Sequence, residues 1–142
     1  MGVIRIVIDT NVITSALMSK KGYSYRLLSI IDDVRFKPYI STPLIFELED
    51  VVQRNKRKIK LNQNEIDDIL DYICYVAEQR KIFFLWRPFL KDPKDDMFLE
   101  LAVEANCDYI ITFNKKDFLG IEKFGLKALT PKEFFELLGD IK

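Results

Sequence analysis

The chain contains no histidine among its 142 residues, and this absence narrows the chemistry open to it. It excludes histidine bases, Ser-His and Cys-His dyads, and histidine-rich metal sites. The two cysteines, Cys74 and Cys107, have neither the spacing of a zinc site nor that of a disulfide framework, and we expect reduced thiols in the core. If the chain is an enzyme, carboxylates and oxygen-binding metal ions remain as its tools.

The sequence also lacks net charge and long apolar runs. Lys+Arg 22 and Asp+Glu 22 cancel, so any nucleic-acid role must depend on local basic patches. Its apolar runs are too short for a signal peptide or a membrane span, and we expect a cytoplasmic protein. With 49% hydrophobic and 13% aromatic residues, the chain predicts one folded domain over residues 1–142.

Apolar segments alternate between the periods of strands and helices. Strands are expected at Val3–Ile8, Pro38–Ile40, Ile82–Leu85, Tyr109–Thr112 and Lys127–Leu129. Helices are expected at about 12–18, 23–31, 43–54, 65–79, 93–106 and 131–138, the third with Thr42 as N-cap and Pro43 at N1. This alternation predicts an α/β protein in which helices cover both faces of a parallel sheet of about five strands. Ligands of such sheets bind beyond the carboxyl ends of the strands.

Four acids fall at that predicted edge. Asp9 follows the first strand, Glu47 borders the apolar face of its helix, Asp95 lies beside a packed helix face, and Asp117 follows the fourth strand. Taken singly, each has an ordinary explanation as a cap, a solvated side chain or a turn residue. By helical phase, we expect Asp96 to share a solvated stripe with the later acids Glu100 and Glu104.

Taken together, the four acids predict a metal site. Converging carboxylates without basic partners repel one another and raise their own pKa values, and a divalent cation relieves the repulsion. An all-oxygen set matches Mg²⁺ or Mn²⁺, which can lower the pKa of a bound water for attack on a phosphodiester. Asn11 follows Asp9 closely and could steady its carboxylate.

Four segments together resemble the PIN-domain family, and especially its toxin-like subfamily of VapC-type ribonucleases. They are IVIDTNV (6–12), STPLIFELEDVV (41–52), DPKDDMFLELAVEANCDYIITFNKKDF (92–118) and LTPKEFFELL (129–138). The resemblance implies a three-layer α/β/α fold and a Mg²⁺- or Mn²⁺-dependent endoribonuclease. It further implies the toxin half of a toxin–antitoxin pair, with an antitoxin as partner and a homodimer as assembly.

The resemblance also assigns residues. It implies Asp9, Glu47, Asp95 and Asp117 as catalytic acids, with the metal on Asp9, Asp95 and Asp117. The segment at 92–118 usually ends in the family with an apolar strand followed by Thr-x-Asp-x-x-Asp-Phe, and Thr112, Asp117 and Phe118 match this ending. Asn114 stands where the family has Asp; an amide oxygen can bind Mg²⁺ but does not neutralise it. We therefore expect one firmly held metal, supported by Asn11, Thr112 and Asn114, and a weaker second one.

Basic residues form two groups that could contact RNA phosphates. The first is a run at Arg54, Lys56, Arg57 and Lys58, which has a solvated loop as its ordinary explanation. The second is Lys115 and Lys116, next to the predicted site.

Two other functions compete with the nuclease. A catalytically weak or inactive PIN-like module that binds RNA or a partner protein would explain Asn114. A haloacid-dehalogenase-type phosphotransferase also begins with a strand and an Asp, but it needs a second Asp where this chain has Asn11.

Overall fold

The computed structural model describes residues 2–82 and 89–141, and in this part of the chain five parallel strands form one sheet. The strand order is β3-β2-β1-β4-β5. The strands are β1 (Ile4–Ile8), β2 (Phe36–Ile40), β3 (Glu78–Gln79), β4 (Tyr109–Ile111) and β5 (Lys127–Leu129). Central β1 pairs Ile6 with Pro38 of β2 and Ile8 with Ile111 of β4. The ends of β1 and β4 therefore lie side by side.

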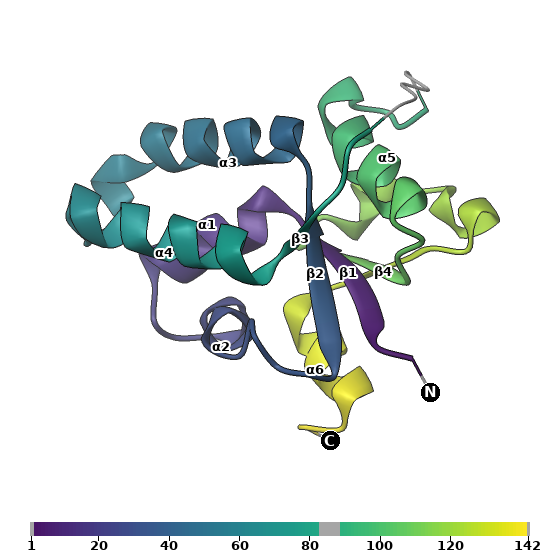
Figure 1. Cartoon of the computed structure of the whole chain (residues 1–142), viewed down its shortest axis with the longest axis horizontal. Coiled ribbons are helices and arrows are strands. Elements are labelled where there is room, and N and C mark those ends of the chain that lie inside the picture. Colours follow the sequence, from purple (N-terminus) through teal and green to yellow (C-terminus); the bar gives the residue numbers. More distant parts are fainter. Residues whose placement is uncertain (1, 83–88, 142) are drawn as a thin grey trace.

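Helices cover both faces of the sheet and make the three layers seen in Figure 1. The α-helices are α1 (Thr10–Met18), α2 (Tyr23–Ser29), α3 (Thr42–Arg54), α4 (Gln63–Val76), α5 (Asp96–Glu104) and α6 (Pro131–Leu138). Short 3₁₀ turns are η1 (Lys56–Lys58), η2 (Pro93–Asp95), η3 (Lys115–Phe118) and η4 (Ile121–Phe124). None of the helices in the described ranges combines the length and apolar character that crossing a bilayer requires.

The two cores follow from the alternation of side chains along the strands. Ile6 and Ile8 of β1 face a core shared with α1, α2, α4 and α6, whereas Val7 faces a core shared with α5, η3 and η4. Ile111 and Ile110 of β4 divide between these cores in the same way. Both faces of each central strand are thus buried, which is why these strands are apolar almost throughout.

Local capping signals determine where several helices begin. Thr130 and Asn62 form capping boxes with the Glu three residues later, at the starts of α6 and α4. At the start of α3 the predicted cap is wrong by one residue. Ser41 is the N-cap, and its hydroxyl accepts a hydrogen bond from Leu44 N at 3.3 Å, while Thr42 is already helical.

The expected fold is confirmed, but the third strand differs from the prediction. The chain leaves α4 at Val76 and pairs with β2 through Glu78 and Gln79, a segment expected to be the end of a helix. The predicted strand at Ile82–Leu85 lies outside the described residues except for Ile82, which is not in a strand. Two polar residues carry no strand periodicity, so backbone pairing with β2 alone defines β3.

The packing of α6 on the sheet gives a direct test of the first core. Phe134 is 0% exposed and its ring meets the edge of Phe36 at 5.1 Å between centroids. We expect Phe134→Ala to lower the free energy of unfolding by about 3–5 kcal/mol, because it removes a fully buried aromatic side chain and leaves a cavity. Urea unfolding measures this. The control is Leu137→Ala on the same helix, where the side chain is 46% exposed, and an equal loss in both variants would contradict the packing described.

Candidate functional site

The site is built around Asp9, at the point where β1 meets β4. Asp9 N donates to Ile111 O at 2.8 Å, which extends the parallel pairing by one residue beyond β1. The Thr112 hydroxyl, which is completely buried, donates to Asp9 Oδ2 at 2.8 Å. Asn114 N in turn donates to Thr112 Oγ1 at 3.0 Å. Two strand ends and the loop after β4 are thus joined through one carboxylate.

Asp9 is also the N-cap of α1, as its ordinary explanation predicted. Its Oδ1 accepts from Asn11 N at 3.4 Å, and the side chain is only 6% exposed. Burial raises the pKa of Asp9, and hydrogen bonds, with that from Thr112 foremost, work against the rise. Among the described residues, the buried Asn11 Oδ1 accepts no hydrogen bond. A desolvated carboxylate and a free amide oxygen therefore lie within two residues of each other.

Asp95 brings a second carboxylate to the same place from the turn before α5. Burial, followed by the charge of Asp9 and then those of Asp92, Asp117 and Asp96, raises the pKa of Asp95 from 3.8 to about 7. The largest of these charge effects comes from Asp9, 86 residues earlier in the sequence. The structure therefore brings two of the other predicted acids, Asp9 and Asp117, close enough to Asp95 for their charges to act on it.

This donor set suits a hard cation that keeps part of its water shell. Within residues 2–82 and 89–141, no three carboxylates or thiolates are arranged as a complete metal cage. Mg²⁺ dehydrates reluctantly and is commonly bound by one or two carboxylates together with water and substrate phosphates. Asp9 and Asp95 are the carboxylates that would hold such an ion, and Asn11 Oδ1, which has no hydrogen-bond partner among the described residues, would be a neutral oxygen ligand. The residues present fit Mg²⁺ or Mn²⁺ in chemistry.

Glu47, the fourth predicted acid, is engaged elsewhere. Its Oε1 lies 3.3 Å from Arg54 Nη2, two helical turns further along α3, and its side chain is 26% exposed. The same guanidinium lies 3.1 Å from Asp50 Oδ2. Helix α3 packs against α1 and α5, whose N-caps are Asp9 and Asp95, so Glu47 is on a neighbouring element. A basic partner neutralises it there, whereas no ion pair joins Asp9 or Asp95 to a base within residues 2–82 and 89–141.

The prediction that Asp96 belongs to a solvated stripe is wrong. Asp96 is 2% exposed and Glu100, one turn later, is 3% exposed, whereas Glu104 is exposed. The helical phase was right, because these residues do share one side of α5. The side is covered because the chain before the helix folds back over it, and Leu90 N donates to Asp96 Oδ1 at 2.9 Å. Sequence periodicity could not reveal this, since it records only which residues share a face.

The stretch after β4 divides its lysines between two roles. Lys115 Nζ lies 2.9 Å from both carboxylate oxygens of Glu133 on α6, so its charge is compensated. Lys116 is exposed. Asp117 N donates to Asn114 O at 2.9 Å, which curls the chain into η3 and brings Asp117 back toward Asp95. Asn114 is exposed and contributes its backbone to this turn.

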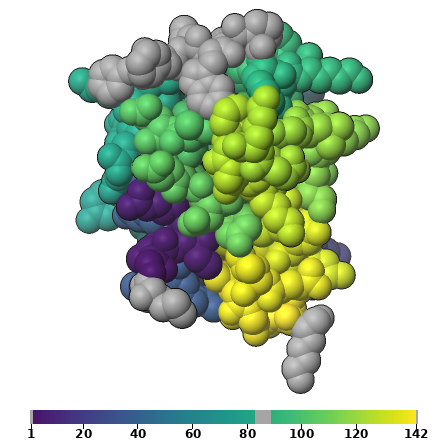
Figure 2. Space-filling model, turned by 90° about the vertical axis from the view of Figure 1, so that its right-hand side faces the viewer, coloured from purple at the N-terminus to yellow at the C-terminus, as the bar shows by residue number. Residues whose placement is uncertain are grey.

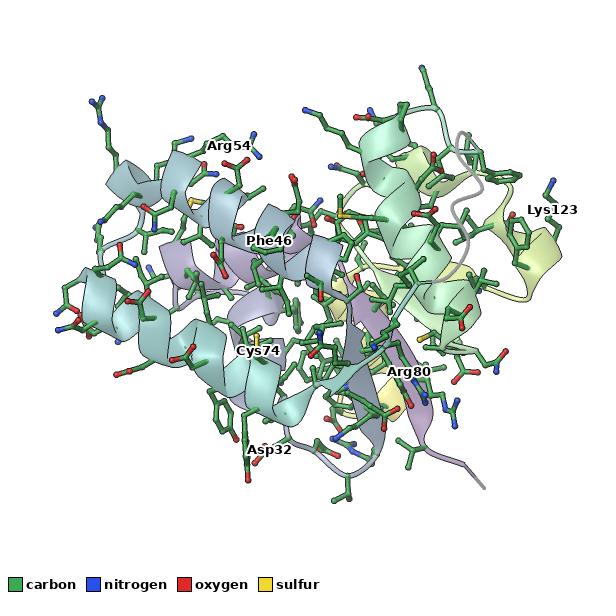
Figure 3. The ribbon with its side chains drawn as sticks, turned by 45° about the horizontal axis from the view of Figure 1, so that its top comes forward. Asp32, Phe46, Arg54, Cys74, Arg80 and Lys123 are labelled. Carbon is green, nitrogen blue, oxygen red and sulfur yellow. The ribbon has the colours of Figure 1, made fainter. Side chains whose placement is uncertain are left out.

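The longer basic run begins at the last residue of α3, and only Arg54 pairs with one of the four predicted acids, Glu47. Arg54 ends α3, and Lys56, Arg57 and Lys58 form η1 just beyond it. A helix rises 1.5 Å per residue, so Arg54 lies about 18 Å along the axis from Thr42, the residue where α3 leaves the sheet edge. In Figure 3, Arg54 and Lys123 lie on opposite sides of α5. Lys56 donates to Gln63 at 2.8 Å, while Arg57 and Lys58 are exposed.

The raised pKa of Asp95 makes metal-free stability depend on pH. Folded Asp95 retains its proton up to about pH 7, whereas an unfolded Asp releases it near 3.8. The folded state therefore binds more protons in this window, and stability falls as pH rises through it. Asp9 acts with the same sign.

We expect Asp95→Asn to flatten this fall in stability, as measured by thermal unfolding in EDTA from pH 4 to pH 8. The control is Asp92→Asn, which removes an exposed carboxylate from the same turn and should retain most of the slope. Wild type and Asp95→Asn with equal slopes would show that Asp95 is not desolvated in this way.

Comparison with known proteins finds a matching family model and a relative of similar length. The model of the family described as PIN domain matches residues 5–116. That range contains Asp9, Glu47 and Asp95 and ends one residue before Asp117. The uncharacterized protein MJ1680 of Methanocaldococcus jannaschii is 29% identical over 144 residues, covering 94% of this chain and 90% of that protein.

A solved structure shares the fold. It is VapBC2 from Rickettsia felis bound to a DNA fragment from their promoter, with a TM-score of 0.58 over 88% of this chain and 98% of that chain. The sequence identity is 17%, so this similarity concerns the fold alone. The arrangement of a parallel sheet with helices on both faces is therefore found in this chain and in a protein of largely different sequence.

Proposed function

This chain belongs to the PIN-domain family, and we propose that it is a metal-dependent endoribonuclease. The single observation that carries the proposal is the pair Asp9 and Asp95. The two carboxylates come from distant parts of the chain, and the charge of Asp9 is the foremost electrostatic cause that raises the pKa of Asp95 to about 7. Such a pair is costly for the fold unless a cation binds it.

Asp9 and Asp95 would hold Mg²⁺ or Mn²⁺, with Asp117 close by and Asn11 Oδ1 as a neutral oxygen donor. When bound, such an ion neutralises phosphate charge and acidifies water for attack on a phosphodiester. The chain's own residues then have positioning roles. Thr112 orients the Asp9 carboxylate by donating a hydrogen bond to Oδ2, while Oδ1 lies on the side of Asn11. Because the hydroxyl is completely buried, this orientation is shielded from competing water.

Glu47 completes the predicted set of acids in a different way. Since Arg54 balances its charge, Glu47 is held on α3 without adding to the repulsion around Asp95. When RNA phosphates draw Arg54 toward them, Glu47 becomes available to the site. The ion pair between Glu47 and Arg54 is partly exposed, so exchanging its partners costs little.

Exposed basic residues give the RNA a path from the acids along α3. Lys116 lies beside Asp117, and Arg57 and Lys58 lie beyond the far end of α3. An extended single strand of a few nucleotides would span the length of α3, about 18 Å along its axis, and phosphate contacts at both ends would set its register. Lys115 and Lys56 are the weaker candidates for RNA contact, because each already has a partner within the fold.

The proposed biological setting is a toxin silenced by an antitoxin protein. Support comes from the resemblance to the toxin-like PIN subfamily and from the fold shared with VapBC2 of Rickettsia felis. Exposed apolar side chains at Phe46, Tyr75 and Leu119 offer contact sites for an antitoxin or for a second copy in a homodimer.

A catalytically inactive RNA- or partner-binding module is the second candidate. Asn114 favours it, because this position bears Asp in the family motif that the chain resembles. The incomplete metal cage among the described residues points the same way. The cost of desolvating Asp9 and Asp95 argues for the nuclease, since a binding module gains nothing from such acids.

Cleavage of RNA decides between these functions. We expect wild-type protein to cut single-stranded RNA with Mn²⁺ or Mg²⁺, and EDTA to abolish the cutting. Asp9→Asn removes the central charge and should lower the rate by more than the roughly 10- to 100-fold that follows loss of an outer metal partner. Glu122→Gln, an exposed acid on η4, is the matched control. RNA binding that is equal in wild type and Asp9→Asn, without cleavage under any metal, would establish the binding module instead.

The amide at position 114 gives a prediction in the opposite direction. Asn114→Asp adds a carboxylate at the place where the family motif has one, and we expect several-fold tighter Mn²⁺ binding and faster cleavage. Calorimetric titration with Mn²⁺ measures the first effect and a gel assay the second. Asn106→Asp, an exposed amide beyond α5, controls for added charge. If Asn114→Asp matches wild type in both assays, position 114 has no part in metal binding.

A further inference from the structure

Asp96 differs from the other acids of the DPKDD segment in being fully enclosed. It is 2% exposed, and its carboxylate accepts hydrogen bonds from two backbone amides of the preceding chain. Leu90 N lies 2.9 Å from Oδ1, and Phe89 N lies 3.3 Å from Oδ2. Hydrogen bonds to a charged acceptor are strong, and these offset part of the cost of burying the carboxylate.

These hydrogen bonds close a short loop around Asp95. The hydrogen bond from Leu90 N to the Asp96 side chain closes residues 90–96 into a hydrogen-bonded ring. Inside the ring, Asp92 Oδ1 accepts from Lys94 N at 3.0 Å, and Asp92 O accepts from Asp95 N at 3.0 Å. The backbone on both sides of Asp95 is therefore held by hydrogen bonds within one small loop.

Phe89, which donates to Asp96, also packs against the segment that carries Asp117. We call the hydrogen bonds from Leu90 N and Phe89 N to Asp96 the clamp. The Phe89 ring meets Phe124 of η4 edge-on at 5.2 Å between centroids, and Lys123 Nζ lies 4.4 Å from the Phe89 ring. Further in, Phe98 of α5 packs on Phe118 of η3. Figure 2 shows α5 and the η3–η4 segment side by side on one face of the molecule. The loop bearing Asp95 and the turn bearing Asp117 thus pack as one unit.

We propose that Asp96 is a positioning residue: its carboxylate closes the loop at Leu90 and Phe89 and thereby holds Asp95 toward Asp9 and Asp117. The inference rests on the proposed function, because the position of Asp95 matters only if it binds a cation there. The Asp96 carboxylate is itself occupied by hydrogen bonds from the chain before α5. It therefore acts through Asp95 and not by contact with substrate.

Mn²⁺ affinity, measured by electron paramagnetic resonance of the free ion, tests the role of Asp96. Asp96→Ala removes the clamp, and we expect the roughly 10- to 100-fold loss of affinity that follows loss of an outer-shell partner. Asp96→Asn removes the charge but keeps an oxygen for Leu90 N, and it should stay within a few-fold of wild type. Glu104→Ala, an exposed acid on the same helix, should not change the affinity.

Two results would overturn the inference. Wild-type affinity in folded Asp96→Ala would show that Asp95 needs no clamp. Equal losses in Asp96→Asn and Asp96→Ala would show that the charge of Asp96 matters and its hydrogen bonds do not.

Amide hydrogen exchange provides a readout that does not require the alanine variant to fold. In the wild-type protein we expect the amide of Leu90 to exchange about as slowly as that of Ile110 in β4, and Asp96→Asn to retain most of this protection. Rapid exchange of Leu90 in the wild-type protein overturns the clamp. The Mn²⁺ affinities, compared with RNA cleavage, also separate this inference from the nuclease proposal. Protein that binds Mn²⁺ with the expected order of affinities but cuts no RNA supports the clamp and refutes the nuclease.

Discussion

The hydrogen bond from Thr112 to Asp9 is the contact on which the site depends. It exists because β1 and β4 are neighbours in a parallel sheet and are paired in a register that ends both strands together, with Ile8 opposite Ile111. A shift of one residue would turn Thr112 to the other face of the sheet and move Ile111 out of the core in which it packs. The buried apolar side chains of both strands prevent such a shift. The packing of the core therefore orients a carboxylate at the surface edge of the sheet.

Convergence of negative charge at Asp95 is the second constraint. Other acids of this chain are paired with bases, as Glu47 is with Arg54 and Glu133 with Lys115, and Asp33 and Asp140 share Arg35. The pKa values of Asp33, Glu133 and Asp140 are lowered, whereas those of Asp9 and Asp95 are raised by burial and, at Asp95, by neighbouring acids. Local stability is lost where the acids converge, which is typical of sites that acquire a ligand.

Much of the fold was accessible to sequence reasoning because its signals are local. The apolar strands, the Pro at the start of α3 and the Thr130–Glu133 capping box each depend on residues a few positions apart. β3 could not be found, since Glu78 and Gln79 become a strand only by pairing with β2. Asp96 could not be placed either, because the chain segment that covers it arrives from outside the helix. Proximity of Asp9 and Asp117 to the sheet edge was predictable from the order of strands and turns.

By itself, the sequence determined the alternation of strands and helices, the absence of histidine chemistry and the positions of the acids along the chain. These depend on residue type and period, which are properties of the chain before it folds. Only the tertiary structure decided which acids lie close enough to interact electrostatically, which have a basic partner and which one is buried. Charge interactions and burial depend on distances across the fold. Asp95 is therefore affected by the charge of Asp9, Glu47 forms an ion pair with Arg54, and Asp96 accepts hydrogen bonds from the chain before α5.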